Sequence, residues 1–183
     1  PSGNDIRHRL TYSGLYEVPF GKGRRYVTGG PLSYIIGQWS IGGLLTWQSA
    51  PPFTVSTQIN NTFVFSAGGQ RADVSRNPNL PSDQRTLSRW FDTDAFSQPA
   101  QYTFGNQGPG IVRGDGIFSL DMSILRNFSL TERFGLQFRA EMFNSTNHTN
   151  FQEAGSSFGG PGFGIVSAAN PARRVQLGLR MVF

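Results

Sequence analysis

Residue types that commonly catalyse reactions or bind metals are few in this sequence and widely separated. Its 183 residues include no cysteine and only two histidines, His8 and His148, so thiolate chemistry and paired-histidine metal spacing are both excluded. Asp92 and Asp94 have the i, i+2 spacing found in calcium loops, but the glycine and the ligating glutamate of an EF-hand are missing. Nucleophile-elbow and phosphate-binding motifs are also absent from the sequence. We therefore expect no catalytic residue, no metal site, no cofactor and no enzymatic activity.

A second group of residues could bind a ligand without carrying out a reaction. Charged side chains crowd the segment 71–94, and aromatic residues are interleaved with them or follow closely. Arginine and aromatic side chains often contribute most of the binding energy of an interface. The ligand candidates are Arg85, Arg89, Trp90, Phe91, Phe96 and Tyr102. The alternative is that the rings pack internally and fix a long connection in place, with ion pairs among the exposed charges.

The composition favours β-strands as the elements that position these residues. Glycine (23 residues) and proline (11 residues) recur too often for long helices, whereas the 16 phenylalanines suit a pleated surface. The formal net charge is +5, but the basic residues, all arginine except Lys22, are scattered rather than gathered into a stripe. A nucleic-acid partner is therefore not expected. The most apolar window, 35–47, is too short and too polar for a membrane helix.

Five segments show the period-two alternation of a strand that has one apolar face. The clearest is the C-terminal one, in which alternate positions are apolar: Val175, Leu177, Leu179, Met181 and Phe183. Strands are predicted near 8–18, 37–48, 117–128, 134–144 and 174–183. The predicted fold class is therefore all-β: an antiparallel meander of about five long strands, with two long loops. Leu125 and Arg126 interrupt the alternation near the end of the third strand.

The opposite face of these strands carries polar and charged residues. If the strands form a membrane barrel, this face lines the interior, where water or other protein groups can pair with a charge. The residues expected to face the lumen are Asp121, Gln137, Arg139, Glu141, Gln176 and Arg180. They could contact an internal plug or a passing substrate, or they could form a ladder of ion pairs in the barrel wall. Between contact with a plug and contact with a substrate, contact with a plug is the preferred interpretation.

The connections between the predicted strands alternate between short and long. They contain about 18, 68, five and 30 residues in chain order. In an antiparallel meander alternate connections lie at the same end, so both long loops share one end, as in bacterial outer-membrane barrels. Alternation of faces also fits a soluble β-sandwich. Strand length near that needed to span a bilayer, and aromatic residues at strand ends, favour the barrel.

Several motifs resemble, in the same order, the C-terminal end of Oar-like TonB-dependent receptors, a family that carries a carboxypeptidase-regulatory-like domain at its N-terminus. The two longest resemblances are 138–144 (FRAEMFN) with 147–151 (NHTNF), and 172–183 (ARRVQLGLRMVF). Further motifs similar to the family are 5–10, 17–24, 37–43, 48–55, 90–96, 104–106 and 113–114. The resemblance covers nearly the whole chain.

The resemblance implies a Gram-negative outer-membrane receptor that moves a large solute with energy relayed from the inner membrane. Residues 1–183 would form the last five strands of a 22-stranded barrel, without the plug and the N-terminal domain. Its implied partners are outer-membrane lipid, its own plug, the TonB complex through the missing N-terminal region, and the barrel assembly machinery. Phe183, the terminal aromatic residue, would be the signal that this machinery reads. The loops 49–116 and 145–173 would then be extracellular.

Two other functional classes stay open at this stage. One is a passive outer-membrane barrel, either porin-like or adhesin-like, which would lack a plug. The other is a soluble β-sandwich that binds carbohydrate. The cargo, which could be a ferric siderophore, an oligosaccharide, a peptide or an exported protein, is not identified by the sequence.

Overall fold

The computed structural model describes residues 3, 5–64, 70–131 and 133–183, which form two compact units. One is a sheet unit built from Leu10–Trp47, Phe118–His148 and Pro171–Phe183. The other, which we call the loop unit, contains the described residues of Pro1–Arg9, Gln48–Ile117 and Thr149–Asn170.

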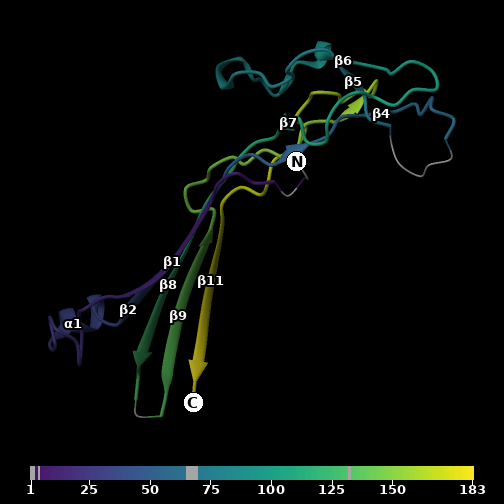
Figure 1. The fold of residues 1–183 in the computed structure, drawn as a ribbon. Helices are drawn as coiled ribbons and strands as arrows, with labels where there is room; N and C mark the ends of the chain where they lie inside the picture. Colours follow the sequence, from purple (N-terminus) through teal and green to yellow (C-terminus); the bar gives the residue numbers. More distant parts are fainter. Residues whose placement is uncertain (1–2, 4, 65–69, 132) are drawn as a thin grey trace. The chain divides into compact units, whose positions relative to one another are not determined.

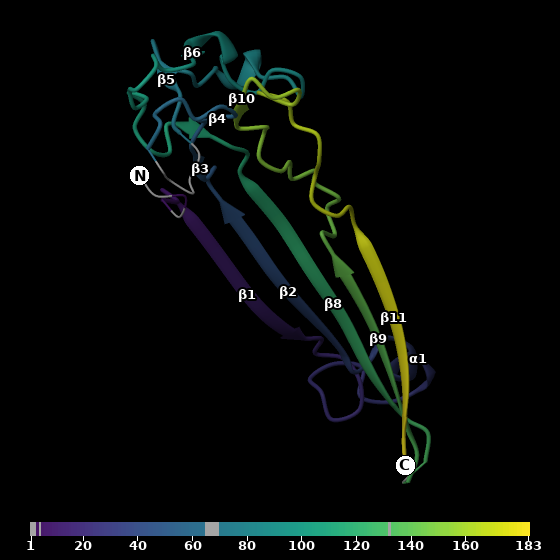
Figure 2. The same cartoon turned by 90° about the vertical axis from the view of Figure 1, so that its right-hand side faces the viewer.

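Five long strands form the sheet: β1 (Arg9–Glu17), β2 (Trp39–Gln48), β8 (Ile117–Ser129), β9 (Gly135–Phe143) and β11 (Arg174–Val182). Their order in the sheet, β1-β2-β8-β9-β11, is also their order in the chain. Figure 2 shows the five strands side by side. β9 runs antiparallel to both β8 and β11. The sheet is therefore the antiparallel meander that the alternating pattern predicts.

The long strands have nine to thirteen residues each. A tilted membrane-spanning strand needs about 9 to 11 residues, so each of them is long enough to cross a bilayer. β1 and β11 lie at the two edges, and their side chains are exposed along the whole strand. A sheet edge presents unpaired backbone N–H and C=O groups, which membrane barrels satisfy by pairing with a further strand.

The strand register separates an apolar face from a polar one. Residues that lie directly opposite each other in antiparallel strands project from the same face of the sheet. Leu179 of β11 lies opposite Phe138 of β9, and one residue further along Arg180 lies opposite Gln137. The apolar residues of neighbouring strands therefore share one face of the sheet, and the polar residues share the other.

The connection between β1 and β2 contains one short helix, α1 (Pro31–Ile36). Pro31 occupies the start of the helix, where its missing N–H costs no hydrogen bond. The backbone packs closely after the helix, because a Cβ atom on Gly37 would lie 2.7 Å from the Cα atom of Gly21. Figure 1 shows α1 at the end of the sheet where β1 ends and β2 begins. Among the described residues, no helix has the length and apolar character to span a membrane.

Short elements make up the loop unit. It contains β3 (Pro52–Phe53), β4 (Ser56–Thr57), β5 (Asp73–Val74), η1 (Ser82–Gln84), η2 (Thr93–Ala95), β6 (Phe96–Ser97), β7 (Val112–Arg113) and β10 (Ser157–Phe158). β3 pairs with β7 and β5 pairs with β6, each within the connection from β2 to β8. The pairing of β10 with β4 is parallel and joins the connection after β9 to the connection after β2.

The two long connections share one hydrophobic core. Its buried residues are Phe53, Val55, Ala72, Trp90, Phe91, Ala95, Phe96, Val112, Ala154 and Val166. Ala154 and Val166 come from the second connection, and the other eight come from the first. Backbone bonds support the same association, since Trp90 N donates to Gly164 O at 2.9 Å and Val166 N donates to Leu87 O at 2.8 Å. The loops are therefore one folded body rather than two separate excursions.

Candidate functional sites

The six residues expected to face a lumen, Asp121, Gln137, Arg139, Glu141, Gln176 and Arg180, lie on one face of the sheet. In the β9–β11 ladder Gln176 lies opposite Glu141, and Arg180 lies opposite Gln137. Arg139 and Glu141, two residues apart on β9, form an ion pair with 2.5 Å between Nη2 and Oε1. The face combines charged, amide and hydroxyl groups, so it can hydrogen-bond water or a polar protein surface.

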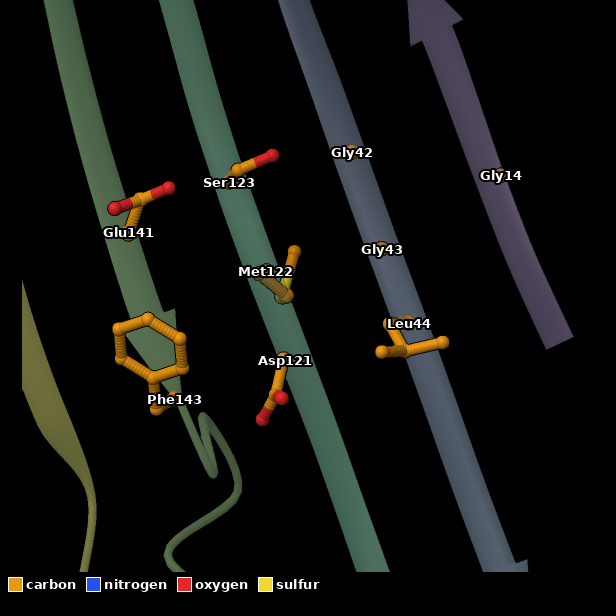
Figure 3. A pocket seen from close by; sticks show the side chains of 9 residues that line it. All are labelled: Gly14, Gly42, Gly43, Leu44, Asp121, Met122, Ser123, Glu141 and Phe143. Atoms are coloured by element: carbon orange, nitrogen blue, oxygen red, sulfur yellow. The ribbon is translucent and has the colours of Figure 1, made fainter. Parts of the chain in front are cut away.

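A concavity of about 340 Å³ interrupts this polar face near Glu141. Figure 3 shows Asp121, Ser123 and Glu141 on β8 and β9, next to the bare backbone of glycines on β1 and β2. A Cβ atom on Gly42 would lie 2.5 Å from Ser123 Oγ, so glycine at this position leaves the hollow open. Asp121 Oδ1 already accepts bonds from Asn144 N at 2.8 Å and from Ser119 Oγ at 3.0 Å. The hollow offers oxygen atoms to a basic or hydrogen-bonding partner.

The other, apolar face of the sheet also carries a charge. Arg126 of β8 lies directly opposite Phe138 of β9, and its neighbour Leu125 lies opposite Arg139. The interruption of the alternating pattern at these two positions is therefore not a bulge: the register continues, and the arginine occupies an apolar-face position. Its side chain is 7% exposed. The residues that shelter it come from the β1–β2 connection, from the start of β2 and from β8 itself.

Three of the six ligand candidates lie in the core of the loop unit. Trp90, Phe91 and Phe96 are 8%, 1% and 5% exposed. The Phe91 ring contacts the rings of Phe96 and Phe163, with centroid distances of 5.7 and 5.3 Å. Internal packing, which was the alternative interpretation of these residues, describes their position. Their rings therefore belong to the packed core of the loop unit rather than to its exposed surface.

Arg89, the next candidate, belongs to an ion-pair cluster centred on Asp92. Burial would raise the pKa of the Asp92 carboxyl group, but hydrogen bonds from Arg76 and Arg89 outweigh it and hold that pKa below its ordinary value. Arg76 Nε lies 2.8 Å from Oδ2 of Asp92, and Arg89 Nη2 lies 2.9 Å from Oδ1. Arg89 also lies 3.3 Å from the exposed Asp94. Both aspartates therefore form ion pairs with arginine side chains.

The remaining candidates, Arg85 and Tyr102, reach the surface of the loop unit. Arg85 donates from Nε to Leu80 O at 2.9 Å, and its guanidinium lies over the Trp90 ring at 5.6 Å. Tyr102 is exposed and has a positive φ of 65°. Its ring lies 5.1 Å from that of Phe63, which is also exposed and also has positive φ. Bulky residues rarely adopt this conformation, so the exposed pair marks a locally strained surface.

Sequence reasoning missed Phe63 as a candidate for the ligand surface. It lies between Thr62 and Val64, in a stretch that has neither strand alternation nor a ligand motif. Its contact with Tyr102 accompanies the bond from Tyr102 N to Asn61 O at 3.0 Å, which connects segments distant in the chain. No local signal could have found this pair.

In the described part of the chain, no group of three or more His, Cys, Asp or Glu residues is arranged to hold a metal ion.

Comparison with known families decides the class of this strand architecture. A family model described as an outer membrane beta barrel domain matches residues 1–176. The chain belongs to this family. Neither the curated proteins nor the solved structures that were compared with the chain include a match. As an outer-membrane β-barrel domain, the chain is located in the outer membrane of a Gram-negative bacterium, with lipid around its strands.

Membership of the outer-membrane barrel family gives the two faces of the sheet a physical meaning. Barrels of this kind present an apolar band to lipid and a polar surface to the interior. On β11 the apolar set Val175, Leu177, Leu179 and Met181 lies on the face that corresponds to the lipid side. Phe183, the expected assembly signal, follows this strand and is exposed.

Proposed function

We propose that this outer-membrane barrel domain is part of an Oar-like TonB-dependent receptor, which moves a large solute across the outer membrane with energy from the inner membrane. The observation that carries the proposal is the ordered run of motifs similar to that family. The two longest of these motifs form β9 with the turn after it, and β11. In this proposal the chain performs no covalent chemistry and needs no cofactor.

Five strands are fewer than the smallest membrane barrels contain, which is about eight. We propose that β1 and β11, the edges of this sheet, pair with further strands of the same protein, and that a plug lies inside the closed barrel. The polar face supports this arrangement, because its charged residues and its concavity beside Glu141 suit contacts with a folded polar domain. Arg139 and Glu141 already pair with each other, so their net charge contribution to a passing solute is small.

The orientation of the strands follows from the lengths of the connections. Outer-membrane barrels have short periplasmic turns and longer extracellular loops. We therefore propose that the loop unit is extracellular and that the end of the sheet carrying α1, the β8–β9 turn and Phe183 is periplasmic. Cysteine labelling tests this, because the chain itself contains no cysteine. A membrane-impermeant maleimide added to intact cells should label Ser82→Cys in the loop unit and not Arg133→Cys in the β8–β9 turn.

The solute surface in this proposal lies on the loop unit, around its exposed groups. Arg85 and the Phe63–Tyr102 pair are candidates, since Arg85 lies against Trp90 and the two exposed rings contact each other. The buried Trp90, Phe91 and Phe96 keep the surface in one conformation. A surface that is ordered before a ligand arrives loses less entropy on binding than a flexible loop does.

Adjacent residues on β11 provide a direct test for a plug. The contiguous protein, expressed with its own signal sequence, would carry a photo-crosslinking amino acid at Arg180 on the polar face or at Leu179 on the apolar face. If a plug fills the barrel, the probe at position 180 forms an adduct with an upstream segment of the same polypeptide, identified by peptide mapping. The probe at position 179 should form lipid adducts only.

The same experiment distinguishes the alternatives. A passive barrel, porin-like or adhesin-like, is folded in the outer membrane but gives no internal adduct from position 180. In a TonB-dependent receptor, crosslinking to TonB should also be detected in cells and lost when the TonB gene is deleted. If position 180 gives an internal adduct but no crosslink to TonB is detected, energy coupling is contradicted and the barrel assignment stays intact.

A further inference from the structure

Arg126 is a buried cation on a face that meets lipid. It lies opposite Phe138 in the β8–β9 ladder, three residues before β8 ends. The Phe128 ring lies 4.1 Å from its guanidinium carbon, and the Trp39 ring lies 5.1 Å away. A guanidinium with aromatic rings around it loses much of its hydration, so a compensating anion or acceptor stabilises it strongly.

The protein supplies only part of that compensation. Arg126 Nη1 donates to Ile35 O at 2.7 Å, at the C-terminal end of α1. Trp39 Nε1 donates to the same carbonyl at 3.2 Å, so this oxygen is shared. Arg126 Nε is buried and makes no hydrogen bond, and no ion pair to Arg126 is found among the described residues. A buried guanidinium normally has a carboxylate or phosphate partner.

A concavity lies next to this group. It has a volume of about 700 Å³ and is formed by the β1–β2 connection together with the end of β8. Arg126 and Lys22 line it, along with the hydroxyl-bearing residues Thr28, Ser33 and Tyr34. The described residues of its lining include no carboxylate. Two cations and several hydroxyl donors at one hollow constitute the chemistry that recognises a phosphate group.

The side chains around the hollow suit the boundary between lipid tails and headgroups. Leu32, Tyr34 and Ile35 of α1 are all exposed. Tyrosine and tryptophan concentrate at this boundary because their rings are apolar and their polar atoms hydrogen-bond to headgroups or water. Arg25, over the ring of Tyr26 at 5.3 Å, adds another cation to the same connection. Basic residues near a membrane surface attract anionic lipid.

We propose that the hollow at Arg126 binds the phosphate of a membrane phospholipid, with α1 resting in the headgroup region of the leaflet at this end of the sheet. Arg126 supplies the buried cation and Lys22 an accessible one. Phospholipid is the favoured occupant because the apolar face of the sheet contacts lipid, and the lipid headgroup is the anion present there. The choice of leaflet rests on the strand orientation proposed above. The lipid site itself does not depend on the proposed transport function.

Native mass spectrometry of the complete outer-membrane protein in detergent tests the proposal, with phosphatidylglycerol as the probe. Arg126→Gln should lower the apparent affinity for the lipid about tenfold, as expected from loss of one charge-assisted contact. Arg180→Gln is the matched control, because Arg180 lies on the polar face at nearly the same level along the strands. Arg180 is opposite Gln137, and Arg126 is opposite the adjacent Phe138. The control should leave lipid retention unchanged.

Retention unaffected by Arg126→Gln, or lowered equally by Arg180→Gln, would overturn the proposal. If Arg126→Gln does not assemble, the exposed Lys22→Gln decides the question: a loss of about threefold supports the site, and no loss overturns it. Inorganic phosphate separates a lipid site from a general anion site, since thermal stabilisation by phosphate alone equal to that by lipid would contradict a lipid-specific site. A solute uptake assay on the same variants reports separately on the proposed transport function.

Discussion

Leu177 of β11 lies directly opposite Ala140 of β9 on the apolar face, yet Leu177 is 69% exposed and Ala140 is buried. The difference arises because β11 is an edge strand, whereas β9 lies between β8 and β11. Leu177→Arg should therefore impair insertion, at a cost of about 2 to 4 kcal/mol near the bilayer midplane. Heat-modifiable gel mobility measures the folded fraction. Gln176→Arg, one residue away on the polar face, is the control and should assemble normally.

Phe91 should be the residue on which the loop unit depends most. Its side chain is almost fully buried among Phe53, Phe96 and Phe163. Phe91→Ala leaves a cavity in this cluster and should destabilise the loop unit by about 3 to 5 kcal/mol. Limited proteolysis on intact cells should detect faster cleavage of the loops. Tyr102→Ala removes an exposed ring and should leave the cleavage rate close to that of the wild type.

The loop unit should lose stability at acidic pH because of Asp92. The pKa of Asp92 is lower in the folded protein than its ordinary value of 3.8, so the ionised carboxylate stabilises the fold above that value. This contribution is lost as the pH falls from about 4 through the folded-state pKa, when the carboxylate accepts a proton. Proteolysis of the loops at a series of pH values measures the effect. Asp92→Asn should remove this component of the pH dependence and weaken the loop unit at neutral pH.

Gly105 should tolerate no side chain. A Cβ atom there would overlap the backbone oxygen of Arg71 and lie 2.6 Å from that of Ala72. Gly105→Ala should therefore displace backbone inside the loop unit and destabilise it by about 1 to 3 kcal/mol. Its thermal midpoint should fall by several degrees. Gly108→Ala is the control, because its nearest neighbour is a side-chain atom of Ile111 at 3.7 Å. Equal midpoints for the two variants would contradict this packing.

Phe183 should influence assembly more than stability. The residue is 92% exposed and follows the last paired position of β11, Val182. Its removal eliminates little packing, so the folded protein should have a nearly unchanged unfolding midpoint once formed. If the terminal aromatic residue is the assembly signal, deletion lowers the amount of folded protein in the outer membrane, as measured by fractionation. Phe183→Trp should restore it, and equal yields of all three proteins would argue against the signal.

The five long strands could be predicted from sequence because strand alternation is a local property. Every second residue of a strand points to the same face, so Leu177 and Leu179 reveal their common face without knowledge of any partner. The polar set, including Glu141 and Arg180, followed from the same rule. Ends differ by one or two residues: the segment expected near 134–144 is Gly135–Phe143 in the structure.

The loop unit could not be predicted in the same way. Its paired strands have two residues each, too few to show a period, and its core unites residues that are distant in sequence. The pairing of Phe158 with Thr57 leaves no signature in either segment alone. Aromatic residues such as Phe91 have the same sequence appearance whether they bind a ligand or fill a core. Arg126 was missed as a site for a related reason, because its buried position depends on Trp39 and on α1.

The shared core of the two loops also constrains the order in which this protein can mature. Phe91 emerges from the ribosome well before Phe163, its neighbour in the folded cluster. Until the later segment is available, the earlier loop has an aromatic surface without its partner, and such surfaces are prone to aggregate or to recruit chaperones. A polypeptide truncated before residue 149 would keep β1, β2, β8 and β9 and lose this partner. The first loop must therefore be kept soluble until the second loop is available to pack against it.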